Sequence, residues 1–175
     1  MIVWLGKYKS GNGRLFFMIT VDSVYPVFSR KPTNNRKNHQ NPSENHMKIE
    51  NHTPDNLFTP IGPYSHFSKA GNFIQISGTP GVNPHTGEMA GSDAYSQAKQ
   101  ILLNFQTMLN SINLDLSHIL HIHVFLKNVD DFAEMNRAYS ELFCNHLPAR
   151  TVICVADLPK KGALMTMNAT AVEPS

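Results

Sequence analysis

The sequence predicts an α+β domain in which two helices pack on one face of a β-sheet. Two segments with strand character are each followed by a segment with the apolar periodicity of a helix, and two more strand-like segments close the chain. The chain has 175 residues, of which 41% are hydrophobic and 16% are charged, as is usual for a globular protein. This length suits one domain with an additional segment.

The first strand-helix unit begins with "NFIQISG", residues 72–78, a strand that ends in a glycine turn. A tight turn, "NPHTGE" at residues 83–88, follows it. Either Ser92 or Asp93 can cap the next helix, whose apolar residues recur at steps of three and four. This stripe, which we expect in the core, consists of Ala98, Ile101, Leu102, Phe105, Met108, Leu109 and Ile112.

The second unit pairs an alternating strand at residues 119–128 with a helix over residues 130–143. The apolar side of this helix carries Phe132, Met135, Tyr139, Leu142 and Phe143. Asn136 lies on that same side. Because a buried amide must find partners or reduce stability, Asn136 is either a structural bracket or a site residue.

The last two strands are predicted at residues 151–158 and 163–172, joined by "PKKG". Arg150 precedes the first of them, with no acid in the following apolar run. A guanidinium at a sheet edge suits a carboxylate or phosphate held by two hydrogen bonds. The alternative is an ordinary surface arginine.

Charge divides the chain into two parts. Residues 1–46 carry seven Lys/Arg and two Asp/Glu, a net +5, whereas residues 47–175 carry eight and eleven, a net −3. We interpret residues 1–46 as a basic extension that is flexible, a targeting peptide or the product of an upstream start, and we favour Met47 as the true start. The domain is therefore residues 47–175. Its acidic balance disfavours nucleic-acid binding.

Several functional classes lack support in the sequence. No apolar stretch approaches the roughly 20 residues that span a bilayer, and the best candidate, residues 15–21, is too short. GxGxxG, P-loop, GxSxG and CxxC motifs are missing. Cys144 and Cys154 are expected to be buried thiols in a reducing cytoplasm and not a disulfide.

Three histidines form H-x-x-H-x-H. His121 and His123 would project from the same face of a strand, a spacing that can serve a metal. His118 completes the pattern, but the sequence offers no third ligand at matched spacing. We therefore expect no metal site.

Four blocks of the sequence resemble the Rid family, also called YjgF-like or L-PSP-like. They are "IGPYSH", "ISGTPGVNPHTGE", "DDFAEMNRAY" and "LPARTVICVADLPKKGAL", in this order and at the family's intervals. The similarity covers about residues 59–172. It leaves residues 1–46 outside.

The resemblance implies a chorismate-mutase-like α+β fold, with a mixed sheet, assembled as a homotrimer with ligand clefts between subunits. Many members hydrolyse reactive imines such as 2-iminobutanoate, 2-iminopropanoate and 2-aminoacrylate to 2-oxoacids and ammonia, without a cofactor. By position, Arg150 would hold the substrate carboxylate, and Asn168 would stand where deaminating members have a glutamate. The other substrate-binding residues carried over are Tyr64 in the cleft wall, Ser77 and Gly78 in its floor, Asn136 as the bracket, and Val152.

Three positions depart from the deaminase pattern. Asn168 replaces the glutamate, Val152 replaces a frequent cysteine, and Thr79 replaces a glutamine. An amide can orient a water by hydrogen bonding but cannot accept its proton. The sequence therefore leaves two hypotheses, an imine deaminase weakened by Asn168 and a non-catalytic trimeric binder or sensor of small carboxylates such as a 2-oxoacid. RNA cleavage or translation inhibition is a weaker third.

Overall fold

The structure is a computed structural model that describes residues 4–9, 15–20 and 47–174. The chain divides into two compact units, residues 1–43 and 44–175, and each is described by itself. In the first unit, β1 (Trp4–Lys9) and β2 (Leu15–Thr20) pair in antiparallel fashion. This hairpin was not predicted from the sequence. Most of residues 1–46 lie outside the residues that the structure describes, so the prediction that this segment is flexible stays a prediction.

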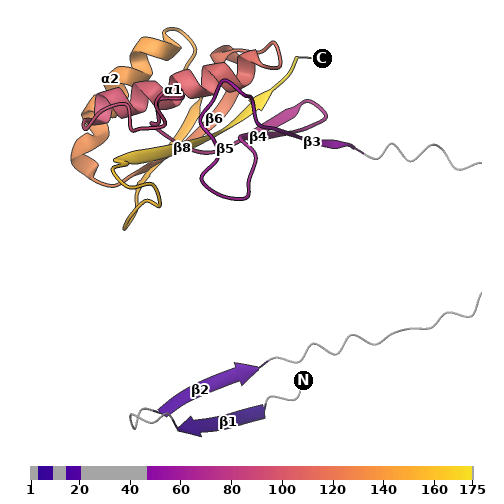
Figure 1. Ribbon diagram of the computed structural model, residues 1–175, viewed down its shortest axis with the longest axis vertical. Coiled ribbons are helices and arrows are strands. Elements are labelled where there is room, and N and C mark those ends of the chain that lie inside the picture. Colours follow the sequence, from indigo (N-terminus) through magenta and orange to yellow (C-terminus); the bar gives the residue numbers. More distant parts are fainter. Residues whose placement is uncertain (1–3, 10–14, 21–46, 175) are drawn as a thin grey trace, which may run out of the picture. The chain divides into compact units, whose positions relative to one another are not determined.

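The second unit contains a six-stranded mixed sheet in the order β3-β4-β5-β8-β6-β7 (Figure 1). The parallel pair is β6 with β7, and the other neighbours are antiparallel. The strands are β3 (Ile49–His52), β4 (Phe67–Ala70), β5 (Phe73–Pro80), β6 (Ile119–Leu126), β7 (Ala149–Cys154) and β8 (Met165–Val172). The predicted position of Arg150 at a sheet edge is confirmed, because β7 is the last strand.

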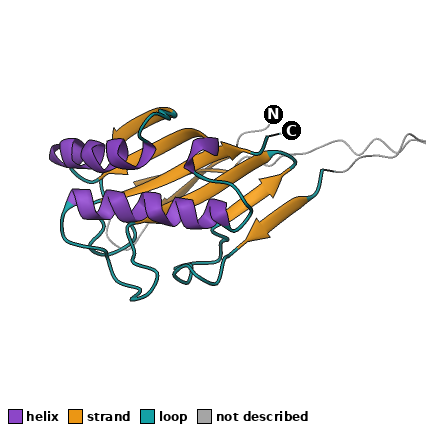
Figure 2. Cartoon of the chain, turned by 90° about the horizontal axis from the view of Figure 1, so that it is seen from above, coloured by secondary structure: helices purple, strands orange, loops and turns teal. Residues whose placement is uncertain are grey.

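Two helices, α1 (Ala94–Asn110) and α2 (Phe132–Phe143), lie on one face of this sheet (Figures 1 and 2). Short 3-10 turns, η1 (Leu116–His118) and η2 (Val129–Asp131), precede β6 and α2. The predicted α+β class is confirmed. In the part of the chain that the structure describes, no helix combines the length and the hydropathy needed to cross a membrane.

Some predicted boundaries were wrong for local reasons. The strand predicted over residues 151–158 begins at Ala149 and ends at Cys154, because β6 ends at Leu126 and leaves the later residues without a continuing ladder. The last strand begins at Met165 and not at residue 163, since the Ala163 N–H donates to the Lys160 carbonyl and closes a turn.

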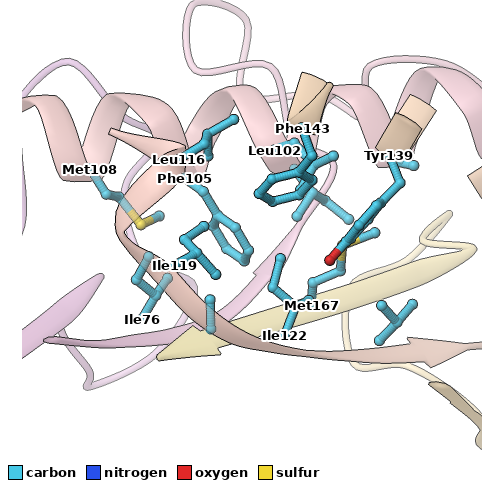
Figure 3. Packing of buried hydrophobic residues seen from close by; sticks show 14 of the residues in the cluster. Ile76, Leu102, Phe105, Met108, Leu116, Ile119, Ile122, Tyr139, Phe143 and Met167 are labelled. Atoms are coloured by element: carbon cyan, nitrogen blue, oxygen red, sulfur yellow. The ribbon is translucent and has the colours of Figure 1, made fainter. Parts of the chain in front are cut away.

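The core fills the space between the helices and the sheet, where α1, α2 and the strands contribute the large side chains drawn in Figure 3. Along β8 the buried residues Met165, Met167, Ala169 and Ala171 alternate with half-exposed ones. This alternation gives the sheet one face under the helices and one face turned away from them, which we call the open face.

Candidate functional site

Arg150 lies on the helix side of the sheet edge. Its Cα partner on β6 is Ile122, which is fully buried beneath the helices, and paired residues of adjacent strands share a face. The half-buried guanidinium reaches α2, where Nη1 donates a hydrogen bond of 2.8 Å to Oδ1 of Asn136. The predicted polar residue on the apolar side of α2 therefore has a partner, and that partner is Arg150.

No carboxylate pairs with Arg150 in the described part of the chain. The guanidinium carries five N–H donors, of which Asn136 takes one and the Met135 sulfur, at 3.8 Å from Nη1, is a weak second acceptor. By contrast, the other arginine of the domain, Arg137, is bonded to Glu134 at 2.6 Å. Arg150 is thus a positive charge with unused donors, which favours binding of an anion.

The Tyr139 ring supports the guanidinium. The central carbon of Arg150 lies 4.7 Å from the ring centroid, a distance typical of a cation-π contact. Burial raises the pKa of Tyr139 to about 12, and the positive charge of Arg150 acts in the opposite direction. The phenol therefore stays neutral at physiological pH and does not neutralise Arg150.

Asn168 lies on the open face of the sheet. Its neighbours on β8, Met167 and Ala169, are buried on the helix side, so Asn168 projects away from the helices. It is the Cα partner of His123 on β6, and Asn168 Oδ1 lies 3.0 Å from His123 Nδ1. The two residues predicted to be catalytic, Arg150 and Asn168, are therefore on opposite faces of the same chain's sheet.

A β-bulge at Ser77 and Gly78 lies opposite Asn168. Ile76 pairs with Ala169 and Thr79 pairs with Met167, so two residues of β5 oppose one residue of β8. Thr79 is buried, and its Oγ1 donates a hydrogen bond of 2.9 Å to the Ser77 carbonyl. The threonine that departs from the family pattern therefore stabilises the bulge.

Ser77 connects this bulge to the loop that carries Tyr64. Its Oγ donates to the Ser65 carbonyl at 2.7 Å, and its N–H donates to the His66 carbonyl at 2.9 Å. Tyr64 is 36% exposed, so its ring is accessible. The predicted substrate-binding residues Tyr64, Ser77 and Gly78 therefore belong to one local structure.

A pocket of about 370 Å³ lies beside the bulge. Its lining is mostly apolar, with Lys160 as the one charged lining side chain from the described residues. The lining residues are Ile61, Gly62, Tyr64, Gly78, Pro80, Leu158, Pro159, Lys160, Ala163 and Thr166. Of the predicted site residues, Tyr64 and Gly78 line it, whereas Ser77, Asn136, Arg150, Val152 and Asn168 do not.

Gln97 of α1 holds the loop that forms one wall of this pocket. Its fully buried Nε2 donates to the carbonyls of Gly91 and Gly162, both at 2.9 Å, and its Oε1 accepts from the Leu164 N–H at 2.8 Å. Sequence reasoning missed this residue. The one feature of the sequence that could have indicated a buried Gln97 was its position beside Ala98, at the start of the apolar stripe of α1.

The structure therefore forms two separate groups of candidate residues. Arg150, Asn136 and Val152 are at the β7 edge on the helix side, since Val152 pairs with the buried Val124. The other group is at β5 and β8 on the open face. At roughly 4.8 Å per strand, β7 lies about 10 Å from β8 and about 14 Å from β5. One chain does not bring the two groups together.

The predicted geometry of the histidine motif is confirmed in part. The rings of His121 and His123 lie on the same face with centroids 4.3 Å apart, while His118 bonds with Asp115 in the cap of η1. Among the described residues, no group of three or more His, Cys, Asp or Glu side chains could hold a metal ion.

The prediction of buried thiols was wrong, because Cys144 and Cys154 are both free and exposed. Cys144 follows the last turn of α2, and Cys154 ends the edge strand β7.

Comparison with known proteins identifies the family. Residues 54–173 match the family described as "Endoribonuclease L-PSP". The chain belongs to this family. The predicted resemblance is thereby confirmed over nearly the range that the sequence blocks indicated.

Individual relatives of this L-PSP family chain agree with the assignment. A RutC family protein of Pyrococcus horikoshii is 41% identical over 106 residues, which cover 61% of this chain and 84% of the relative. A 2-iminobutanoate/2-iminopropanoate deaminase of Dermatophagoides farinae is 31% identical over 114 residues, or 65% of this chain and 89% of the relative. The crystal structure of E. coli TdcF with bound serine covers 71% of this chain and 99% of TdcF, with 30% identity and a TM-score of 0.67.

Proposed function

We propose that this L-PSP family chain hydrolyses small 2-iminoacids, such as 2-iminobutanoate and 2-iminopropanoate, to 2-oxoacids and ammonia. The observation that carries the proposal is the unpaired guanidinium of Arg150, held by Asn136 and by the neutral Tyr139 ring. The similarity to the Dermatophagoides farinae deaminase supports the choice of substrate.

In the proposed reaction Arg150 binds the substrate carboxylate. A guanidinium offers two parallel N–H donors that match the two carboxylate oxygens. The hydrogen bond to Asn136 fixes the orientation of the Arg150 guanidinium before the substrate binds, which lowers the entropic cost of binding. The carboxylate then fixes the position of the neighbouring C=N carbon, which water must attack. We propose that the reaction needs no cofactor.

We further propose that each site forms between two copies of the chain in a homotrimer. Arg150 of one copy would face the open-face group of the next, formed by the Tyr64 loop, the Ser77–Gly78 bulge and Asn168. The separation of these groups within one chain supports this arrangement, because a small substrate cannot span about 10 to 14 Å between two faces of a sheet. In such a site the amide of Asn168 would orient the attacking water.

A second candidate function is binding of a small carboxylate without turnover, as a carrier or sensor. Asn168 favours it, because an amide does not accept a proton. The bound serine in the TdcF structure shows that this relative holds a small amino acid, which fits the same proposal.

For either candidate function, the free, exposed thiols fit a reducing compartment, and we propose a cytoplasmic location.

An RNA-directed activity is the weakest candidate. The family's description refers to an endoribonuclease, but the net charge of residues 47–175 is −3. Phosphate binding relies on clustered cations, which release counterions on contact with nucleic acid. We therefore do not propose RNA as a substrate of the domain.

The test of the deaminase proposal uses 2-iminobutanoate generated in situ in the presence of semicarbazide, which traps the imine. An active protein lowers the yield of trapped imine, because it hydrolyses the imine first. We expect the native chain to lower the yield and Arg150→Ala to lose this effect. A native chain without effect that still binds 2-oxobutanoate would favour the binder. Equal imine hydrolysis by the native chain and by Arg150→Ala would contradict both candidates.

A further inference from the structure

We propose that His123 is the proton acceptor for the attacking water, in the place where Asn168 cannot act. This inference rests on the proposed imine hydrolysis and names a further catalytic residue for it. It assigns separate tasks to two adjacent side chains on the open face. Asn168 orients the water, and the His123 imidazole takes its proton.

The first observation is the position of His123 in a row across the sheet. The bulge at Ser77 and Gly78 on β5 lies opposite Asn168 on β8, and Asn168 in turn is the Cα partner of His123 on β6. All three positions face away from the helices. His123 is therefore one strand away from the residue that would position water, and it is exposed on the same face.

The second observation is the hydrogen bond between the two side chains. Asn168 Oδ1 lies 3.0 Å from His123 Nδ1. An amide oxygen only accepts hydrogen bonds, so Nδ1 carries the proton. In the neutral ring Nε2 then has a free lone pair, and no side chain of the described residues contacts Nε2 within hydrogen-bond distance. The bond to Asn168 thus selects the tautomer in which the accessible nitrogen is the base.

The third observation is that only one other base, His121, lies on the same face of these four strands. The four strands β5, β6, β7 and β8 contain no Asp or Glu at all. Apart from His123, the titratable side chain on their open face is that of His121. Its Nε2 lies 3.3 Å from Thr151 Oγ1, and it makes no hydrogen bond with Asn168. His123 is therefore the group best placed to handle the proton.

The proposed steps balance as follows. The water oxygen forms a bond to the carbon of the protonated imine, the C=N π pair moves to nitrogen, and one water proton passes to His123 Nε2. The imidazolium then returns this proton to the amine nitrogen of the carbinolamine. As the C–N bond breaks and ammonia leaves, the hydroxyl oxygen forms C=O and releases its proton to Nε2. The imidazolium then gives this proton to the departing ammonia, which regenerates the neutral base. The products are the 2-oxoacid and ammonium, and no oxidant or reductant is needed.

The test compares four full-length proteins in the semicarbazide assay with 2-iminobutanoate. His123→Gln keeps a hydrogen-bonding side chain beside Asn168 but removes the base, and we expect its turnover to fall by about 10²-fold or more. His121→Gln is the matched control, because it removes the neighbouring imidazole of the same face, and we expect near-native turnover. The double variant His123→Gln/Asn168→Glu places a carboxylate in the row, and we expect it to recover activity.

Two readouts separate catalysis from structure. Affinity for unreactive 2-oxobutanoate, measured by calorimetry, should be unchanged in His123→Gln, since Arg150 holds the carboxylate. Recovery of turnover by a carboxylate at position 168 is not expected if His123 only maintains the fold. Should His123→Gln not fold by circular dichroism, His123→Thr replaces it, because a β-branched residue suits a strand.

The outcomes distinguish this inference from the proposed function. An active native chain together with an equally active His123→Gln variant overturns the role of His123 and leaves the deaminase proposal intact. Loss of activity in both histidine variants to the same extent also overturns it. An inactive native chain overturns the deaminase proposal and, with it, the proposed role of His123 as proton acceptor.

Discussion

The proposed binding of an anionic ligand depends on one side chain, that of Arg150. It is half-buried at a sheet edge, bonded to an amide and packed on a neutral ring, and no acid of the described residues neutralises it. An arginine in such surroundings loses part of its hydration without gaining an ionic partner. An anionic ligand supplies that partner.

Replacement of Arg150 should weaken binding of a 2-oxoacid. We expect Arg150→Ala to raise the Kd for 2-oxobutanoate about 10- to 100-fold, which corresponds to the loss of one hydrogen-bonded charge interaction. Arg137→Ala is the control, because Arg137 is an exposed arginine paired with Glu134. Calorimetry measures both. Unchanged affinity in Arg150→Ala would exclude the proposed carboxylate site.

Replacement of Asn168 should act in the opposite direction on turnover. Asn168→Glu places a proton acceptor beside the bulge, and we expect imine hydrolysis to increase by up to about 10²-fold. Thr170→Glu is the control, since Thr170 lies two residues further along the same face of β8. The semicarbazide assay compares them. A similar gain in both variants would indicate a general effect of charge and not a specific position.

Sequence reasoning reached some of these residues and not others. The lack of an acid beside Arg150 and the need of Asn136 for a partner were both readable, because they depend on residue type and helical spacing. The contact of Asn168 with His123 was not readable, because it depends on the pairing of β8 with β6, 45 residues apart in the sequence. His123 was therefore considered only as a metal ligand.

At the scale of elements, the pocket wall depends on α1. The loop between β7 and β8 contributes Leu158, Pro159, Lys160 and Ala163 to the pocket, and Gln97 binds the end of this loop through Gly162 and Leu164. Sequence spacing defined α1 well, but a polar anchor within a buried helix face has no distinctive pattern.

Removal of this anchor should destabilise the domain. Gln97→Ala leaves two carbonyls and one N–H without partners in a buried position, and we expect the free energy of unfolding to fall by about 2–4 kcal/mol. Gln106→Ala is the control, because Gln106 bonds to Asn110 on the helix surface. Urea unfolding of both variants decides the point. Equal stability would mean that the loop does not depend on Gln97.

The N-terminus of α1 gives a prediction about acid. The Asp93 side chain accepts a hydrogen bond from the Ser96 N–H at 2.8 Å, and this bond lowers the pKa of Asp93 in the folded state. The stabilisation is therefore present at neutral pH and is lost as the pH falls through the lowered pKa. We expect Asp93→Ala to cost about 1 kcal/mol at pH 7.

The acid dependence has its own control. Ser92→Ala should be neutral, because the structure identifies Asp93 as the cap of the two candidates. The difference in unfolding free energy between Asp93→Ala and the native chain should shrink below the usual pKa of an aspartate. A constant difference from pH 7 to pH 2 would contradict the role of the charged cap.

Not all elements were predictable. The long amphipathic helices and the strands β5, β6 and β8 carry clear periodic patterns, and their positions were predicted to within a few residues. Strands β3 and β4 were missed because each has four residues, too few for a period-two pattern. The hairpin of β1 and β2 was missed because its apolar run at residues 15–21 was considered only as a membrane span, and residues 1–46 were interpreted together as a basic extension.

At the scale of the whole molecule, the sheet has two faces that serve different purposes. The helix side holds the core and, at the β7 edge, Arg150. The open face holds Asn168, the bulge and two histidines. Because candidate residues of one site lie on both faces, the proposed activity needs a second copy of the chain. The family and the fold could be predicted from local motifs. The distribution of the candidate residues over the two faces could not, because it depends on the order of the strands in the sheet.

Complementation between two inactive variants tests this arrangement. Arg150→Ala and Asn168→Ala each damage a different half of the proposed site. Co-expressed, they assemble at random, and roughly one quarter of the interfaces combine an intact Arg150 with an intact Asn168. The two variants mixed as separately folded, non-exchanging proteins are the control.

Imine hydrolysis by the co-expressed pair is the most direct measurement of the central claim. The account predicts that each variant alone is nearly inactive and that co-expression restores about a quarter of native turnover. Co-expressed protein no more active than the separate variants, from a native chain that is itself active, would contradict a site shared between copies.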